Sequence, residues 1–155
     1  MLSGWKRAAV LAGIVLALAF YTLWRSVPEK SVIDQLETRL AAYSIKTLGG
    51  QPRPLNSYVR HYAVINPRVA ADLPFTTVPG GLSDPPDKRL IAGVLTAPDA
   101  GERPGVRRVA KRDLPVVVRG GCATVNVLYD PSDDQLIDAW CNLADRTPAS
   151  ATPQG

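Results

Sequence analysis

The sequence contains few of the residues from which metal and redox sites are built. It has one histidine and two cysteines in 155 positions, which leaves too few ligands for a transition-metal centre. We therefore expect no metal site and no cofactor. The chain also lacks internal repeats, which excludes a solenoid. Its 12 glycines and 14 prolines exclude a helical bundle or a coiled coil.

The excess of positive charge is small. Eighteen Lys and Arg residues oppose 14 Asp and Glu residues, giving a formal net charge of +4. Lys6 and Arg7 supply half of this excess, so residues 25–155 carry a net charge of +2. So mild a balance, without aromatic residues between the basic ones, argues against nucleic acid as a partner. The length fits one small domain with an accessory segment.

A long apolar run near the amino terminus predicts a membrane segment. Residues 8–24 contain no charged side chain and would extend about 25 Å as a helix. Trp5 lies before this run, and Tyr21 and Trp24 lie at its far end. Aromatic side chains at these positions suit the two lipid–water boundaries. We expect a signal-anchor that is retained and crosses the membrane once as a transmembrane helix.

A cleaved secretory signal is the alternative for this segment. Lys6 and Arg7 would be its basic start, and Ala17-Leu18-Ala19 would be its cleavage site. The apolar run continues past Ala19 to Trp24, which favours retention. We place the amino terminus in the cytoplasm, with Lys6 and Arg7 at the membrane interface. The larger part of the chain is then periplasmic, on a bacterial inner membrane.

The chain divides into four segments. We expect a short cytoplasmic head at 1–7, the anchor at 8–24, a small periplasmic α+β domain at 25–143 and a disordered tail at 144–155. Spacings of three and four predict an amphipathic helix over residues 28–45. Its stripe should pack on the sheet of the same domain, and a docking helix for another membrane protein is the alternative. The apolar positions of the stripe are Val32, Ile33, Leu36, Leu40, Tyr43 and Ile45.

Short β-like runs separated by turn signals follow the helix. The runs are 58–65, 89–95, 105–110, 123–129 and 135–141, with 114–118 as a weaker candidate. They predict a small antiparallel sheet of about four or five strands. Residues 74–87 are long for a connection, and this length is typical of either a binding loop or disorder.

Two cysteines flank the last predicted hairpin. Asp130-Pro131-Ser132-Asp133 fits a type I turn. Centring the hairpin on this turn places Cys122 directly opposite Cys141. Two cysteines and no others in an exported chain predict one bridge. We expect a Cys122–Cys141 disulfide that closes the hairpin, and two free buried thiols are the alternative.

A basic cluster precedes the last hairpin. It is either a patch for an anionic partner close to the membrane, such as lipid headgroups or an acidic protein face, or a solvated edge strand kept soluble by its charge. Its residues are Arg103, Arg107, Arg108, Lys111 and Arg112.

Two other polar groupings fall short of a functional motif. Oxygen side chains alternate between Asp130 and Asp138, but Gln135 and Cys141 stand where a calcium loop needs Gly and Glu. We expect a solvated turn there. His61, within the polar-aromatic run 58–62, has no carboxylate or nucleophile that the sequence places beside it. We expect a structural role for it and no catalytic residue.

The order of a hydrophobic helix, a proline, an amphipathic helix, strands and a carboxy-terminal disulfide resembles type IV pilin-like subunits in architecture only. In that family the leader is cut after a Gly that precedes a hydrophobic stretch with Glu at its fifth position. Here Gly4 is followed by Trp5, Lys6 and Arg7, and no Glu precedes Glu29.

The leading hypothesis is a non-enzymatic accessory protein anchored in the inner membrane. It would contact membrane lipid and would bind or brace another envelope protein in a complex. One alternative is a released periplasmic binding or inhibitor module cut near Ala19, and another is a pilin-like subunit.

Overall fold

The computed structural model describes residues 27–47, 50–78, 82 and 85–144. The predicted head at 1–7 and anchor at 8–24 lie outside these residues, as do the interface positions Trp5, Lys6, Arg7, Tyr21 and Trp24. Residues 145–155 of the predicted tail also lie outside them. Among the described residues, no helix has both the length and the apolarity needed to cross a bilayer.

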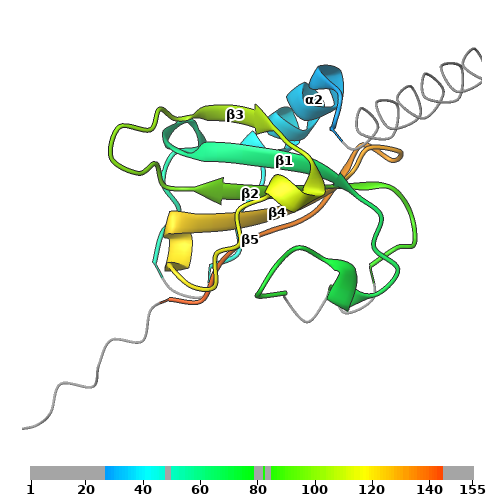
Figure 1. Ribbon diagram of the computed structural model, residues 1–155. Coiled ribbons are helices and arrows are strands. Elements are labelled where there is room, and N and C mark those ends of the chain that lie inside the picture. The colour runs from blue at the N-terminus through cyan, green and yellow to red at the C-terminus, as the bar shows by residue number, and fades with distance from the viewer. Residues whose placement is uncertain (1–26, 48–49, 79–81, 83–84, 145–155) are drawn as a thin grey trace, which may run out of the picture.

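One α-helix and a five-stranded mixed sheet make up the described fold (Figure 1). The sheet order is β3-β1-β2-β4-β5. The elements are α2 at Lys30–Ala41, β1 at Val59–Ile65, β2 at Leu90–Thr96, β3 at Gly105–Arg108, β4 at Thr124–Asp130 and β5 at Gln135–Cys141.

The predicted antiparallel sheet is wrong at β3. Three neighbouring pairs are antiparallel, but β3 runs parallel to β1. In the final sheet β2 lies between β1 and β4, so β3 cannot pair with β2 and lies at the margin of the sheet, next to β1. The chain reverses direction once after β2, so β3 runs the same way as β1.

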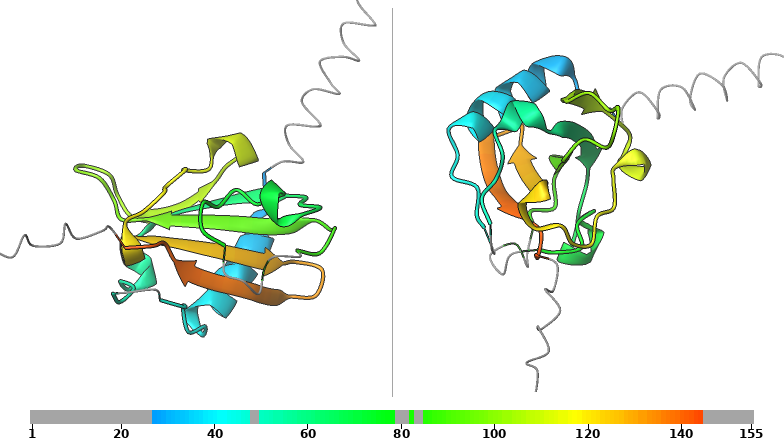
Figure 2. Two further views of the ribbon diagram at one scale, coloured as in Figure 1. Left: turned by 90° about the horizontal axis from the view of Figure 1, so that it is seen from below. Right: turned by 90° about the vertical axis from the view of Figure 1, so that its left-hand side faces the viewer.

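The helix α2 covers one face of the sheet (Figure 2). It is shorter than predicted, since Pro28 and Glu29 precede its first residue and it ends at Ala41. Its apolar stripe packs on the sheet of its own domain, as predicted, and this leaves the docking-helix alternative without an exposed stripe. Ile33, Leu36 and Leu40 are buried in this core cluster, and Val32, Tyr43 and Ile45 pack against it.

Loops cover the opposite face of the sheet. Leu73, Leu82 and Leu114 are buried there against strand residues such as Leu128 and Trp140. Leu82, like Phe75 and Val78 that pack against this cluster, belongs to the predicted loop 74–87. The described part of that loop therefore covers the hydrophobic cluster on this face of the sheet.

The disulfide prediction is confirmed, but the hairpin register on which it rested is wrong. Cys141 lies opposite Val125, three residues from the predicted partner. Residues 131–134 join the strands with Asp134 at a φ of 50°, and the register shifts between Leu128 and Tyr129. Cys122 reaches Cys141 from the 3-10 turn Gly121–Ala123, with the two Cα atoms 4.6 Å apart.

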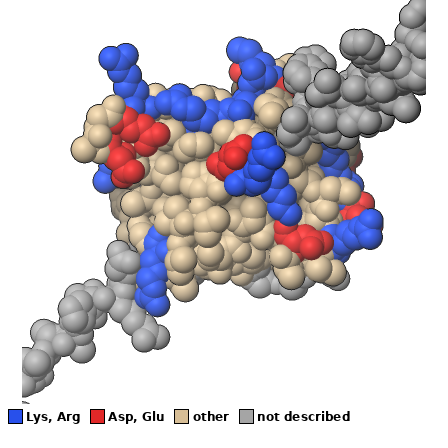
Figure 3. Space-filling model, viewed as in Figure 1, with Lys and Arg blue, Asp and Glu red and all other residues tan. Residues whose placement is uncertain are grey.

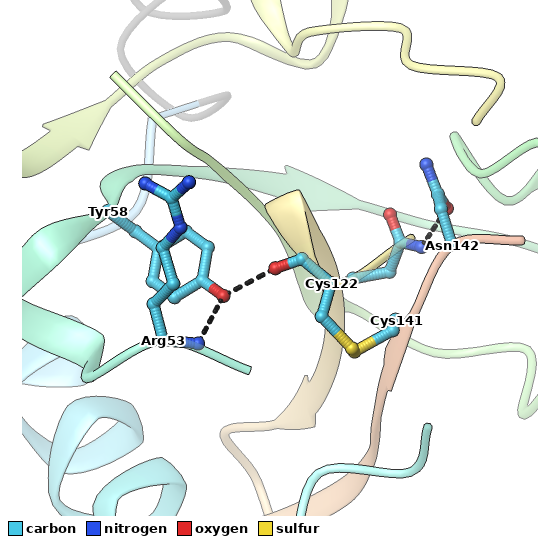
Figure 4. The surroundings of a disulfide bond; sticks show 6 residues. Arg53, Tyr58, Cys122, Cys141 and Asn142 are labelled. Atoms are coloured by element: carbon cyan, nitrogen blue, oxygen red, sulfur yellow. Dashed lines mark hydrogen bonds between the residues drawn. A yellow bond between two sulfur atoms is a disulfide. The ribbon is translucent and has the colours of Figure 1, made fainter. Parts of the chain in front are cut away.

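A tyrosine secures the turn that carries Cys122 (Figure 4). The fully buried Tyr58 hydroxyl donates to the carbonyl oxygen of Cys122 at 2.5 Å and accepts from the backbone N–H of Arg53 at 2.9 Å. The bridge therefore joins the end of β5 to a turn that is itself held by the segment before β1.

Candidate functional site

An open apolar groove of about 580 Å³ lies on the loop-covered face. One wall comes from the segment after the 3-10 turn Ala70–Asp72, and the other comes from the 3-10 turn Lys111–Asp113 and the residues that follow it. Apolar side chains supply most of the surface, and two cations stand among them. The lining residues are Pro74, Phe75, Thr76, Lys111, Arg112, Leu114 and Val116.

Val116 of the groove lining and Val118, two residues further, are both exposed, and hydrogen bonds fix the backbone of the residue between them. The carbonyl oxygen of Val117 accepts from Thr76 Oγ1 at 2.8 Å and from Asn142 Nδ2 at 2.8 Å. These bonds turn Val117 toward the domain. Its neighbours Val116 and Val118 are 77% and 63% exposed. The two exposed valines therefore form an apolar surface on a backbone that is already fixed in one conformation.

A buried polar pair supports this arrangement from below. Asn126 Nδ2 donates to Asn142 Oδ1 at 2.7 Å, and both side chains are buried. The pair leaves Asn142 Nδ2 free to donate to the carbonyl oxygens of Val117 and Arg119. A buried amide must satisfy its hydrogen bonds, so these contacts hold the segment in place.

One wall of the groove rests on Trp140, the only tryptophan among the described residues. Phe75 packs edge-on against Trp140, with ring centroids 4.9 Å apart. Trp140 Nε1 donates to the carbonyl oxygen of Thr77 at 2.7 Å. The loop that forms one wall is thus attached to β5 by both an aromatic contact and a hydrogen bond.

The structure divides the predicted basic cluster between the groove and the edge of the sheet. Lys111 and Arg112 line the groove. Arg107 and Arg108 lie on β3, an edge strand with an exposed pattern of side chains, and Arg103 precedes it. Figure 3 shows basic side chains in a row along this edge. A solvated edge strand and a patch for an anionic partner both fit this placement.

The residues of the polar-aromatic run 58–62 point alternately to the two faces of the sheet, because all of the run but Tyr58 lies on β1. Tyr58 and Tyr62 are buried in the cluster beneath α2. Burial, and then the Glu37 carboxylate, raise the pKa of Tyr62 well above its usual value, and the Tyr62 hydroxyl donates to Glu37 Oε1 at 2.5 Å. Arg60 Nε donates to the same oxygen at 3.0 Å.

His61 does not join this group. Burial lowers its pKa, against smaller influences that raise it. Its Nδ1 has no hydrogen-bond partner among the described residues. No carboxylate is hydrogen-bonded to the ring within the part of the chain that the structure describes.

The carboxylates of the β4–β5 hairpin are each paired with a cation. Asp130 and Asp133 both contact Lys88, Asp134 pairs with Arg39, and Asp138 pairs with Lys46. Over the described ranges, no group of three or more His, Cys, Asp or Glu side chains could hold a metal ion. The hairpin carboxylates act here as ion-pair partners that fix the turn to the rest of the domain.

Sequence reasoning missed the groove itself. Phe75 lay in a loop with two open interpretations, and 114–118 was a weak strand candidate. The three consecutive valines at 116–118 were the available signal, because an apolar run without strand partners must either be covered or remain exposed.

Comparisons with family models, with curated proteins and with solved structures gave no match for this chain.

Proposed function

We propose that the protein is a non-enzymatic accessory protein of the bacterial inner membrane. Its anchor is the apolar run 8–24, and its domain on the periplasmic side binds a partner protein of the cell envelope through the groove. An oxidising compartment suits the Cys122–Cys141 bridge, because such bridges persist outside the cytoplasm.

The exposed apolar surface at the groove is the observation that carries this proposal. Val116 and Val118 are mostly exposed beside a groove lined by Phe75 and Leu114. An apolar surface in a fixed conformation is typical of a protein-binding site, because little conformational entropy is lost on association. The cations at the rim, Lys111 and Arg112, favour a partner segment that is apolar and flanked by a carboxylate.

Site-specific photocrosslinking in cells tests this proposal. A photoreactive phenylalanine analogue at Val116 should give a discrete protein adduct, and the same analogue at the exposed Gln51 should not. Adding V118D should remove the adduct, since a carboxylate beside the apolar surface would repel the partner. The same adducts from both positions, or none from Val116, would contradict the proposal.

The anchor is tested separately by fractionation. The full-length chain should remain in the membrane after alkaline carbonate extraction, with its amino terminus intact by mass spectrometry. A mature chain that begins at Phe20 and is released by osmotic shock would instead identify a cleaved periplasmic module.

A further inference from the structure

Four basic residues on and around β3 form no ion pair among the described residues, unlike most other described cations of the domain. Within the described part of the chain, no carboxylate lies within 4.0 Å of Arg103, Arg107, Arg108 or Lys111. We refer to these four residues as the basic edge. Elsewhere in the described chain, six cations pair with carboxylates, namely Lys30 with Asp34, Arg39 with Asp134, Lys46 with Asp138, Arg60 with Glu37, Lys88 with Asp130 and Arg112 with Asp113. Three exposed arginines outside the edge, Arg53, Arg68 and Arg119, also have no described carboxylate within 4.0 Å.

One member of the basic edge touches the point where the chain enters the domain. Arg108 Nη1 donates to the carbonyl oxygen of Pro28 at 3.3 Å. Pro28 is buried, so packing fixes its position in the domain. Pro28 follows Trp24, the last residue of the predicted span, by four positions. Four residues reach at most about 14 Å, so the Arg108 end of the basic edge would be tethered close to the membrane surface.

We propose that the basic edge lies against the anionic lipid headgroups of the membrane in which the chain is anchored. This inference rests on the anchor in the proposed function. The tether keeps the Arg108 end of the edge within about two Debye lengths of the headgroups, each about 8 Å at physiological ionic strength. A lipid surface is therefore always available to these charges, whereas an acidic protein would have to be recruited to them.

The form of the edge also suits a flat surface. Side chains alternate along a strand, so Arg107 and Arg108 project to opposite faces of β3. Charge therefore flanks the strand on both sides, and the exposed Val106 lies between Gly105 and Arg107. A row of cations along an edge matches a plane of phosphates better than it matches a single concave site.

This contact would set the orientation of the groove. Lys111 belongs to both the basic edge and the groove rim. With the edge on the headgroups, the groove opens close to the bilayer. The partner segment that it takes would then be the membrane-proximal part of another membrane protein.

Hydrogen exchange of the full-length chain in lipid nanodiscs tests this inference. Discs of phosphatidylglycerol and discs of phosphatidylcholine are compared without any other protein. We expect slower exchange across residues 103–112 in the anionic discs, and no such difference in 1 M salt, where the Debye length is about 3 Å. Amides of β4 report in the same data that the domain is folded.

A matched pair of variants assigns the effect to the basic edge. R103Q/R107Q/K111Q should weaken the protection roughly fivefold for each cation removed. The control R53Q/R68Q/R119Q removes the same number of exposed cations elsewhere and should leave the protection unchanged. Arg108 is retained in both variants because it contacts Pro28.

Four outcomes would overturn the inference. Equal exchange in both kinds of disc, or equal loss in both variants, would show that the edge does not bind anionic lipid. Protection that arises only in native membranes would identify an acidic protein as the partner of the edge and leave the proposed function standing. A chain that elutes free of discs would overturn the anchor, and with it both proposals.

Discussion

The ring of Tyr62 occupies the space that a side chain on Gly93 would need. The two residues pair across β1 and β2. A Cβ atom placed on Gly93 would lie 2.6 Å from Tyr62 Cε1 and 3.0 Å from Val127 Cβ. The missing side chain at position 93 therefore lets the tyrosine lie across β2, beneath α2, with its hydroxyl at Glu37.

Substituting G93A should destabilise the domain by about 1–3 kcal/mol, because a methyl group would force the Tyr62 ring out of its position. Urea denaturation measures the change. In a Y62L background, the leucine side chain is smaller and leaves room for the methyl group, so G93A should cost clearly less there. An equal cost in both backgrounds would show that the ring is not the obstacle.

The bond between Tyr62 and Glu37 should contribute about 1.5–3 kcal/mol to the free energy of unfolding, as hydrogen bonds to charged groups do. Y62F removes the donor, and E37A removes the acceptor and also the ion-pair partner of Arg60, which is only 13% exposed. We therefore expect E37A to be the more destabilising change, with clear coupling in a double-mutant cycle.

The exposed pair of Lys30 and Asp34 on the same helix provides the control for this cycle. D34A should change the free energy of unfolding by less than about 0.5 kcal/mol, since exposed ion pairs contribute little. Additive effects of Y62F and E37A would contradict a direct bond between the two side chains.

Reduction of the Cys122–Cys141 bridge should lower the free energy of unfolding by about 3 kcal/mol, the chain-entropy value for a loop of this length. The two cysteines are 19 residues apart. Urea curves with and without dithiothreitol measure the difference. The C122A/C141A variant should match the reduced protein and be insensitive to the reductant. A wild-type curve that dithiothreitol does not move would show that the bridge is absent.

Asp130 should make the stability of the domain depend on acid pH. Burial opposes ionisation of this carboxyl, but hydrogen bonds from Lys88 and Ser132 outweigh it and lower its pKa to about 2. An unfolded Asp titrates near pH 3.9. The lowered pKa therefore stabilises the fold above about pH 4, and this contribution disappears as pH falls from about 5 to about 2.

The variant D130N tests this dependence. Near pH 6 it should be less stable than the wild type by about 2 kcal/mol, and the difference should shrink toward zero at about pH 2. K88Q, which removes the cation that pairs with Asp130, should flatten the pH profile in the same way. Parallel profiles for D130N and the wild type, measured by thermal unfolding, would contradict this assignment.

The sequence correctly predicted those elements whose formation depends on residues close together in the chain. The strand 135–141 was predicted with the bounds that β5 has, and β1 differs from its prediction by one residue. The apolar stripe of α2 was also correct. In each case a periodic run of apolar residues is bounded by turn residues, so burial and backbone geometry point to the same structure.

Features that depend on distant partners were not predicted. Asp134 has a φ of 50°, which its residue type did not predict, and the connection spans 131–134 where a type I turn over 130–133 was predicted. Val117 is held by Thr76 and Asn142, which lie 41 and 25 positions away. No local pattern in 114–118 reveals these bonds, and they are the reason why the segment forms a groove wall and not a strand.

A backbone contact at the far side of the sheet bears on how copies of the domain behave together. Lys46 N–H donates to Ala139 and its carbonyl oxygen accepts from Cys141 N–H, both at 2.9 Å, so this segment occupies the outer side of β5. The opposite margin is β3, a strand of four residues that includes two arginines. Short charged strands resist pairing with another chain. The described sheet therefore offers another copy little edge on which to add a strand, at β3 and at the covered end of β5.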